Sequence, residues 1–239
     1  MSTTATTLNY FDGDTECKGI YYSPDKPNGS LPIVLVIHAW DGLAQEAKDK
    51  AAKLAESGYI AFAIDVYGEG KTLTDMADLG PTVEPFMTDR HVMLKRLRAA
   101  VDAAKTIAGG DADKIAAMGY CFGGLCALDI ARGGHDDVQG VVSFHGALLP
   151  NGIDTPATIS AKVLAIHGHD DPLVPAETVT AFTQEMTDKK ADWQFVAYGH
   201  TVHAFTRPDA DEAERGILYD AKADRRSWQA MLNFFEEIF

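Results

Sequence analysis

The sequence predicts an α/β fold, a mostly parallel central sheet with helices on both faces, and two observations carry this prediction. Strand-sized apolar runs alternate with segments of helical periodicity along the 239 residues. This alternation is typical of a parallel sheet that is covered on both faces. In addition, Gly119–Gly124 joins an apolar run to a helical segment through a cysteine flanked by glycines, which is typical of a tight strand–turn–helix elbow.

The segments before the elbow support the first half of this prediction. Residues 8–11 and 16–22 flank Asp12-Gly13-Asp14, which is typical of a hairpin turn. The continuous apolar run Ile33–Ile37 and the run 59–66 are typical of strands buried on both faces. Two segments have apolar residues at helical spacing. The first contains Ala47, Ala51, Leu54 and Ala55 and is followed by Gly58, which is placed to end a helix. The second, within 86–109, contains Met93, Leu97, Ala100, Ala104 and Ile107 and is closed by Gly109-Gly110.

The segments after the elbow strand, residues 114–118, continue the alternation. We expect strands at 140–144, 162–166 and 193–198. We also expect one helix after the elbow and a second helix at 176–188. A C-terminal helix should carry on one face Trp228, Met231, Leu232, Phe235 and Phe239. The segment between the first two of these strands is too short for a helical cap domain, which predicts an open site and a small substrate. Because no repeat or Pro/Gly/Ser linker divides the chain, we expect one domain over residues 1–239.

Composition excludes several classes of protein. A hydrophobic share of 46% indicates a globular fold, and a net charge of −14 argues against nucleic acid or an anionic membrane as partner. The polar first ten residues predict no signal peptide, and no apolar run is long enough to span a membrane. Three cysteines are an odd and sparse set, which fits a reducing cytoplasm. Cys17 and Cys126 are expected in the core, and the protein is expected to be a monomer or a small homo-oligomer.

Cys121, at the apex of the elbow, is the first candidate for chemistry. It would lie at the N-terminus of the following helix, where the helix dipole and unused N–H groups favour a thiolate. The alternative interpretation is a buried structural cysteine beside a glycine cluster. A nucleophilic thiol also requires a base, and the base requires an acid that orients it.

Asp171 and His203 are the predicted acid and base. Each follows a predicted strand, and catalytic groups collect at the carboxyl ends of parallel strands. The chain order of nucleophile, acid and histidine is the one expected after such an elbow. Asp170 and His200 are the competitors for these roles. The other histidines are expected to be structural at strand ends, with satisfied hydrogen bonds (His38, His145, His167), or to lie on the surface (His91, His135).

The chain resembles the dienelactone hydrolase family, of α/β-hydrolase fold, over nearly its whole length. The resemblance rests on the elbow Gly119–Gly124, on Asp171 before Val174-Pro175, on His203-Ala204-Phe205 after Tyr198, and on the segment Val36–Gly42. It implies a cofactor-free hydrolase in which Cys121 is the nucleophile, and it favours His203 over His200. It further implies that the backbone N–H groups of Phe122 and Trp40 form the oxyanion hole.

The chain departs from the founding members of that family at two positions in the substrate site. Ala39 stands where they have a glutamate that engages the resting cysteine. Glu69 stands where one of their two carboxylate-binding arginines would be, whereas Arg207 matches the other. The resemblance therefore implies hydrolysis of small esters or lactones, with a neutral or broader preference than dienelactone. A thiolate beside an oxyanion hole also suggests side activity on activated phosphate triesters.

Two other functional classes are retained as alternatives. The segment His167-Gly168-His169-Asp170-Asp171 offers His167, His169 and Asp171 as ligands for a metal-dependent hydrolase. A non-catalytic ligand-binding member of the fold is the second alternative, because a fold does not determine a function. The presence of a nucleophile, a base and an acid together favours the hydrolase that uses neither metal nor cofactor.

Overall fold

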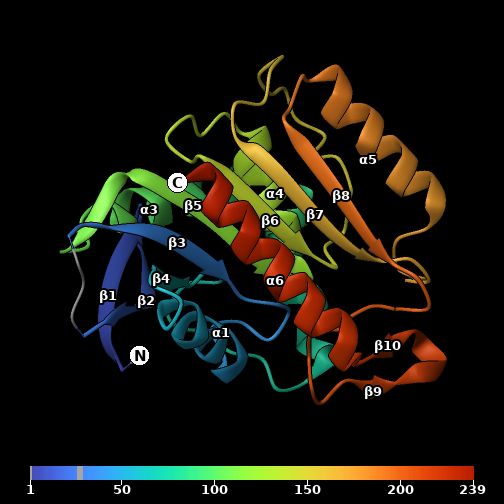
Figure 1. Cartoon of the computed structure of the whole chain (residues 1–239), viewed down its shortest axis with the longest axis horizontal. Coiled ribbons are helices and arrows are strands. Elements are labelled where there is room, and N and C mark those ends of the chain that lie inside the picture. Colours follow the sequence, from blue (N-terminus) through green and yellow to red (C-terminus); the bar gives the residue numbers. More distant parts are fainter. Residues whose placement is uncertain (1, 26–28) are drawn as a thin grey trace. The chain divides into compact units, whose positions relative to one another are not determined.

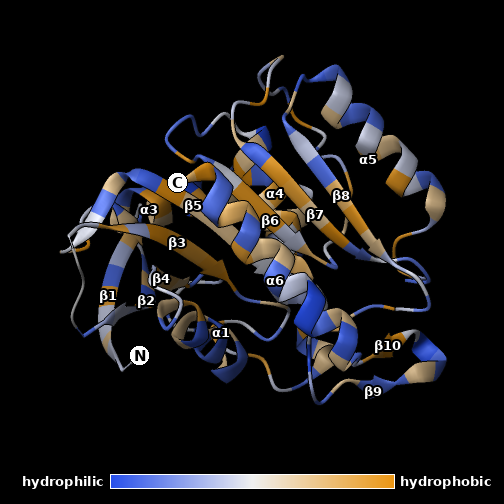
Figure 2. Ribbon diagram, viewed as in Figure 1, coloured by the Kyte–Doolittle hydropathy of each residue, from blue (hydrophilic) through white to orange (hydrophobic). Residues whose placement is uncertain are grey.

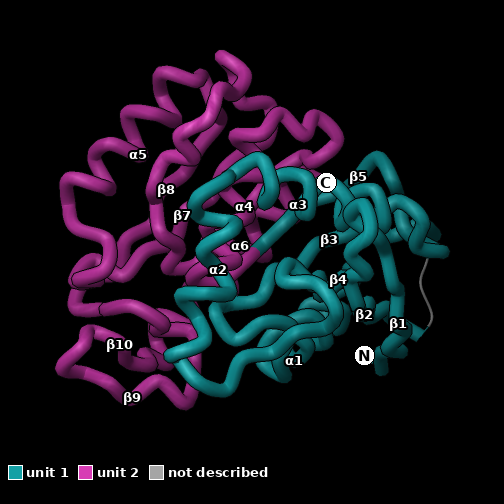
Figure 3. The backbone as a smooth tube through the Cα atoms, turned by 180° about the vertical axis from the view of Figure 1, so that it is seen from behind, with its two compact units in different colours: residues 1–118 teal, residues 119–239 magenta. Residues whose placement is uncertain are grey.

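The computed structural model describes residues 2–25 and 29–239. The chain divides into two compact units, residues 1–118 and 119–239 (Figure 3). The boundary falls inside a strand, between the buried residues Met118 and Gly119. We therefore keep a single domain over residues 1–239 as a proposal, in which Met1 and residues 26–28 lie outside the described part.

Unit 1 begins with the expected hairpin and continues with parallel strands. The hairpin strands pair in antiparallel register, and β3 and β4 pair in parallel. The strand order in this unit is β1-β2-β4-β3-β5. These strands are β1 (Thr3–Asp12), β2 (Thr15–Pro24), β3 (Leu31–Ile37), β4 (Ile60–Ile64) and β5 (Gly110–Tyr120), the last of which ends in unit 2.

The helices of unit 1 correct one prediction. The segment 86–109 is not one continuous helix, because Asp89 is extended and its carboxylate accepts a hydrogen bond from the N–H of His91, which starts a new helix. The helix before this break was not expected from the sequence. The helices are α1 (Gln45–Ala55), α2 (Leu79–Thr88) and α3 (Arg90–Ala104), with a short 3₁₀ turn at Met76–Asp78. The buried side of α1 includes the four predicted residues.

Unit 2 contains three parallel strands in the order β6-β7-β8. All five residues of β6 are buried, and since successive side chains point to opposite faces, both faces of this strand are covered. Figure 1 shows α6 in front of β6 and β7, with α4 behind them. The elements are α4 (Phe122–Arg132), β6 (Gly140–Phe144), β7 (Lys162–Gly168), α5 (Ala176–Asp188), β8 (Trp193–Tyr198), β9 (Asp211–Glu212), a 3₁₀ turn (Ala213–Arg215), β10 (Ile217–Leu218) and α6 (Ala221–Ile238).

The apolar residues gather on the strands and on one side of α6, as Figure 2 shows for β3, β6 and β7. Trp228, Met231 and Phe235 of α6 are buried as predicted. Phe234 is buried as well, whereas Leu232 and Phe239 are partly exposed. Cys17 and Cys126 are fully buried, which confirms their prediction as core residues.

The predicted fold class is confirmed. The main sheet has eight strands, and the pairs β3–β4, β6–β7 and β7–β8 are parallel. Residues 146–161 contain no helix or strand, so no cap domain stands between β6 and β7. Within the described ranges, no helix is both long enough and apolar enough to cross a membrane.

Arg132, the last residue of α4, is fully buried and joins three parts of unit 2. Its guanidinium donates to both carboxylate oxygens of Glu185 in α5, at 3.0 and 2.7 Å. It also donates to the carbonyl of Leu149 at 2.9 Å and pairs with Asp129 at 3.3 Å. The helix that starts at the elbow is thereby tied to the loop after β6 and to the helix after β7.

Arg132→Met should destabilise the protein by about 3–5 kcal/mol, because it leaves the fully buried Asp129 carboxylate without its cation. Urea unfolding measures this loss. Arg98→Met is the matched control, since its pair with Asp102 lies on the surface and should contribute about 0–1 kcal/mol. An equal loss of unfolding free energy in the two variants would contradict the conclusion that Arg132 stabilises unit 2 more than a surface ion pair does.

Candidate active site

Cys121 lies at the apex of a strained turn between β5 and α4. Its φ of 52° and ψ of −113° fall in a region that residues other than glycine rarely adopt. The turn can close because Gly119 has no Cβ; a Cβ at this position would clash with the backbone of Gly123. Gly124 has a similar role, since a Cβ there would lie 2.9 Å from the Cα of Gly146. The glycines predicted to relieve the elbow are therefore required by close backbone contact.

Unit 2 brings Cys121, His203 and Asp171 into one hydrogen-bonded row. The Sγ of Cys121 lies 3.2 Å from Nε2 of His203, and Nδ1 of His203 lies 2.8 Å from Oδ2 of Asp171. Because a carboxylate only accepts hydrogen bonds, Nδ1 carries a proton. The second oxygen of Asp171 accepts the N–H of Leu173 at 2.8 Å, which orients the carboxylate. Asp171 and His203 are 3% and 5% exposed, so water screens this row weakly.

The charge of His203 depends on its two neighbours. Burial lowers the pKa of His203, but the hydrogen bonds to Asp171 and to Cys121, together with their negative charges, outweigh burial and raise it to about 10. The imidazole is therefore protonated at neutral pH in the resting protein. A protonated Nε2 donates to the sulfur of Cys121, which lies 3.2 Å away.

A short hairpin that the sequence did not predict holds the backbone of His203. We call residues 211–218, which comprise β9, β10 and the turn between them, the brace. The N–H of His203 donates to the carbonyl of Gly216 at 2.9 Å, and its carbonyl accepts the N–H of Leu218 at 3.1 Å. Gly216 has a φ of 68° and packs against Pro172, so the brace touches the loops of both the base and the acid.

Gly168, the last residue of β7, allows the histidine loop to approach the acid loop. A Cβ at this position would lie 2.6 Å from the carbonyl oxygens of both Thr201 and Val202. The N–H of Asp170 donates to the carbonyl of Thr201 at 3.0 Å across the same contact. The absence of a side chain at Gly168 is thus part of what brings His203 to Asp171.

His145 lies directly beside the predicted base. Its ring centroid is 5.0 Å from that of His203 and 5.2 Å from that of Phe205, in edge-to-face contact. Its Nε2 shares a hydrogen bond with Oγ1 of Thr206 at 2.8 Å, and its φ is 37°. These contacts fit the structural role expected for His145, but they show the expected hydrogen bonding at Nε2 alone, and nothing in the sequence pattern had indicated the contact with His203.

Four further histidines test the sequence predictions. His38 is satisfied as expected, with Nδ1 at 2.7 Å from the carbonyl of Ala39 and Nε2 accepting the N–H of Val66. The same expectation was wrong for His167: its buried Nδ1 has no hydrogen-bond partner in residues 2–25 and 29–239, because the ring packs against Phe195. His135 was expected on the surface and is buried, whereas His91 is exposed as predicted.

The metal-site alternative is wrong on the geometry of its ligands. His169 is exposed, whereas His167 and Asp171 are buried, because β7 ends at Gly168 and the next residues turn outward. The described residues contain no group of three or more His, Cys, Asp or Glu side chains placed to hold a metal ion. The competing residues also point outward, since the side chain of His200 is fully exposed and that of Asp170 is half exposed.

The other predicted site residues occupy both units. In unit 2, Phe122 is the first residue of α4, and Arg207 is paired with Asp209 at 2.9 Å. In unit 1, Ala39 is buried, and the carbonyl of Trp40 accepts a hydrogen bond from the hydroxyl of Tyr67 at 2.8 Å. Glu69 is exposed in a tight loop, with a φ of 57°. Their roles toward a substrate remain predictions.

Residues 17–239 match the dienelactone hydrolase family. A putative carboxymethylenebutenolidase of Yersinia pestis is 28% identical over 225 residues, which is 90% of this chain and 81% of the relative. The crystal structure of P91, a dienelactone hydrolase-like promiscuous phosphotriesterase from metagenomic libraries, is similar over 100% of both chains, with a TM-score of 0.94 and 38% identity. A putative dienelactone hydrolase of Klebsiella pneumoniae covers 99% of both chains, with a TM-score of 0.82 and 25% identity.

The chain therefore belongs to the dienelactone hydrolase family, and the α/β-hydrolase fold that the resemblance implied is confirmed. It is a hydrolase of that family, and such a hydrolase acts on a small-molecule substrate.

Asp171→Asn should lower the pKa of His203, because the carboxylate that stabilises the imidazolium is removed. A group whose pKa is raised on folding stabilises the fold below its unfolded pKa, near 6.5, and loses that contribution as pH rises through the folded value of about 10. Urea unfolding of the wild type should therefore show this loss over that window, and Asp171→Asn should reduce it, because only the effects of Cys121 then raise the pKa. NMR titration of the imidazole measures the pKa directly.

The matched control for this pH effect is Asp170→Asn, which changes the exposed neighbouring carboxylate. It should leave the titration of His203 almost unchanged. A wild-type His203 that titrates near 6.5 would contradict the charge state described above.

Proposed function

We propose that this hydrolase cleaves small carboxylic esters or lactones through a Cys121–His203–Asp171 triad and a thioester intermediate. The observation that supports this most is the hydrogen-bonded row from Sγ through the imidazole to the carboxylate, at 3.2 and 2.8 Å. The thiolate attacks the acyl carbon, and a C–S bond forms. The backbone N–H groups of Phe122 and Trp40 stabilise the oxyanion, as the family resemblance implied. His203 then gives its Nε2 proton to the leaving alkoxide as the C–O bond breaks.

Acylation also prepares His203 for the second half-reaction. The thiolate charge and its hydrogen bond are two of the effects that raise the pKa of His203, and both disappear when the sulfur becomes a thioester. The neutral imidazole can then take a proton from water, whose oxygen attacks the thioester carbon. As the C–S bond breaks, the acid product leaves and the thiolate–imidazolium pair returns. Asp171 holds Nδ1 protonated throughout.

The preferred substrates are proposed to be neutral. Ala39 lacks the carboxylate that the founding family members use beside the cysteine, and Glu69 places a negative charge where they bind the carboxylate of the substrate. Arg207, the remaining cation, is already paired with Asp209. Side activity on activated phosphate triesters is part of the proposal, and it is supported by the similarity to the promiscuous phosphotriesterase P91.

A non-catalytic binding role is less well supported, because a binding protein has no need for a thiol, an imidazole and a carboxylate in one hydrogen-bonded row. No cofactor enters the proposed reaction. The three cysteines are free thiols, which agrees with the proposal of a reducing, cytoplasmic location. A monomeric or small homo-oligomeric state also remains a proposal.

Cys121→Ala should abolish esterase activity, and iodoacetamide should inactivate the wild type by alkylating Cys121. Cys17 and Cys126 are fully buried, and burial raises the pKa of the Cys17 thiol to about 11, so neither should react in the folded protein. Mass spectrometry of the alkylated and acylated protein identifies the modified cysteine.

The base has a matched control in the same loop. His203→Ala should reduce kcat on the order of 10³-fold or more, since the imidazole acts in both half-reactions, while the exposed His200→Ala should have little effect. Full activity in Cys121→Ala, or the reverse order of the two histidines, would refute the proposed triad.

Glu69→Arg should raise kcat/KM for an anionic lactone relative to a neutral aryl ester, on the order of 2- to 10-fold at low salt. The effect should shrink as salt rises, because Glu69 is exposed. Glu56→Arg, an equal charge reversal at another exposed position, controls for net charge. A wild-type enzyme that prefers the anionic lactone by orders of magnitude would overturn the proposed preference.

A further inference from the structure

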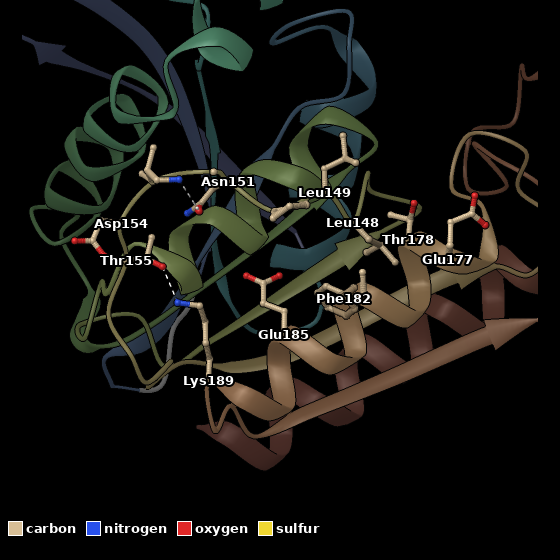
Figure 4. A pocket seen from close by; sticks show the side chains of 14 residues that line it. Leu148, Leu149, Asn151, Asp154, Thr155, Glu177, Thr178, Phe182, Glu185 and Lys189 are labelled. Carbon is tan, nitrogen blue, oxygen red and sulfur yellow. Dashed lines mark hydrogen bonds between the residues drawn. The ribbon is translucent and has the colours of Figure 1, made fainter.

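A cavity of about 580 Å³ in unit 2 lies between the loop 148–155 and α5 (Figure 4). The three residues of the proposed triad do not line it. Its lining sets Asp154, Glu177 and Glu185 against Lys189, whose ammonium already donates to two oxygens of the protein. This cavity contributes nothing to the proposed reaction, whereas a buried histidine in unit 1 does.

His38 is the residue that follows β3 directly, and it is 1% exposed. Its Nε2 accepts the N–H of Val66 at 3.2 Å, and its Nδ1 lies 2.7 Å from the carbonyl oxygen of Ala39. Burial lowers the pKa of His38, so the ring is neutral at neutral pH and carries one proton. A backbone N–H only donates, so Nε2 must be the acceptor and the proton is on Nδ1. Nδ1 therefore donates to the carbonyl of Ala39.

This hydrogen bond fixes the peptide that joins Ala39 to Trp40. A trans peptide is planar, and its C=O and N–H groups point in opposite directions. Because the oxygen of Ala39 is held by the buried ring of His38, the N–H of Trp40 is aimed away from that ring. A hydrogen bond at the oxygen also polarises the peptide, which makes its N–H a stronger donor.

The next two carbonyls of the same segment are held as well. The hydroxyl of Tyr67 donates to the carbonyl of Trp40 at 2.8 Å, and the N–H of Leu73 donates to the carbonyl of Asp41 at 2.9 Å. The ring of Tyr67 packs edge-to-face on that of His38, with 4.6 Å between the ring centroids. The segment 39–41 is thus preorganised, and His38 acts on the peptide that carries the N–H of Trp40.

We infer that His38 is a positioning residue of the oxyanion hole, which aims and polarises the N–H of Trp40 through the carbonyl of Ala39. The inference rests on the proposed function, in which this N–H stabilises the charge that develops on the substrate oxygen. It adds a function to the structural role that the sequence indicated for His38. Because the oxyanion exists in the transition state and not in the bound ester, the effect belongs to kcat and not to KM.

Two variants separate the two hydrogen bonds of His38. In His38→Asn the amide nitrogen is as far from Cβ as Nδ1 is, so the donor for Ala39 is kept and the acceptor for Val66 is lost. In His38→Gln the amide oxygen reaches about as far as Nε2, so the acceptor for Val66 is kept and no donor stands at the Nδ1 position. Each variant loses one buried hydrogen bond, so each is the control for the other.

Steady-state hydrolysis of a neutral aryl ester by the full chain tests the inference. His38→Gln should lower kcat by about 10- to 100-fold with little change in KM, which is less than the loss expected on removing an oxyanion donor outright. His38→Asn should keep kcat close to that of the wild type. A purely structural role of His38 predicts instead that the two variants lose kcat together. Circular dichroism establishes the temperature below which both variants are folded.

Alkylation of Cys121 by iodoacetamide is the second readout. In this reaction a C–S bond forms as the C–I bond breaks and iodide leaves, so no oxyanion develops. The alkylation rate of both His38 variants should match that of the wild type, whereas damage to the thiol or its base would slow alkylation as well.

The inference is overturned if the two variants lower kcat equally, if neither lowers it, or if alkylation slows together with ester hydrolysis. Each of these results leaves the proposed triad intact. Full esterase activity in Cys121→Ala would instead refute the proposed function, and the inference about His38 with it.

Discussion

Close backbone contact at the elbow is the constraint on which the site depends. Gly119 and Gly123 approach so closely that neither a bulkier residue nor a looser turn fits, and Cys121 is held in a backbone conformation that a side chain normally avoids. This conformation ends β5 and starts α4 within one residue. The strain is tolerated because α4 is buried along its length and Arg132 anchors its far end. The thiol position is therefore set by packing over a whole helix.

The site also depends on the mutual stabilisation of its buried charged groups, the imidazole of His203 and the carboxylate of Asp171. Burial alone would lower the pKa of His203, but its hydrogen bonds to Asp171 and Cys121, together with the charges of these groups, outweigh burial and raise it. In a site screened so little by water, each charge depends on the other two. In the reaction that we propose, this coupling lets the same side chain act as an acid before the thioester forms and as a base afterwards.

Much of this arrangement could be predicted from the sequence, and the errors have physical causes. β6, α5 and β8 begin and end where the apolar periodicity indicated, because short buried strands and one-sided helices leave clear patterns. The break between α2 and α3 depends on the carboxylate of Asp89 and not on apolar spacing. The metal-site alternative rested on the spacing of His167, His169 and Asp171, and this spacing could not show that β7 ends at Gly168 and that His169 is exposed. The brace was missed because two-residue strands carry no pattern, and the contact of His145 with His203 joins segments that are distant in sequence.

The brace determines which surface residues near His203 can be substituted without disturbing the site. It is hydrogen-bonded to His203 through main-chain N–H and C=O groups, which are the same for nearly every amino acid. Exposed side chains of the turn, such as Glu214, can therefore be exchanged without moving the imidazole. Only Gly216, pressed against Pro172, lacks this freedom. The hairpin thus holds the backbone of His203 in place while the side chains of its exposed turn remain free to vary.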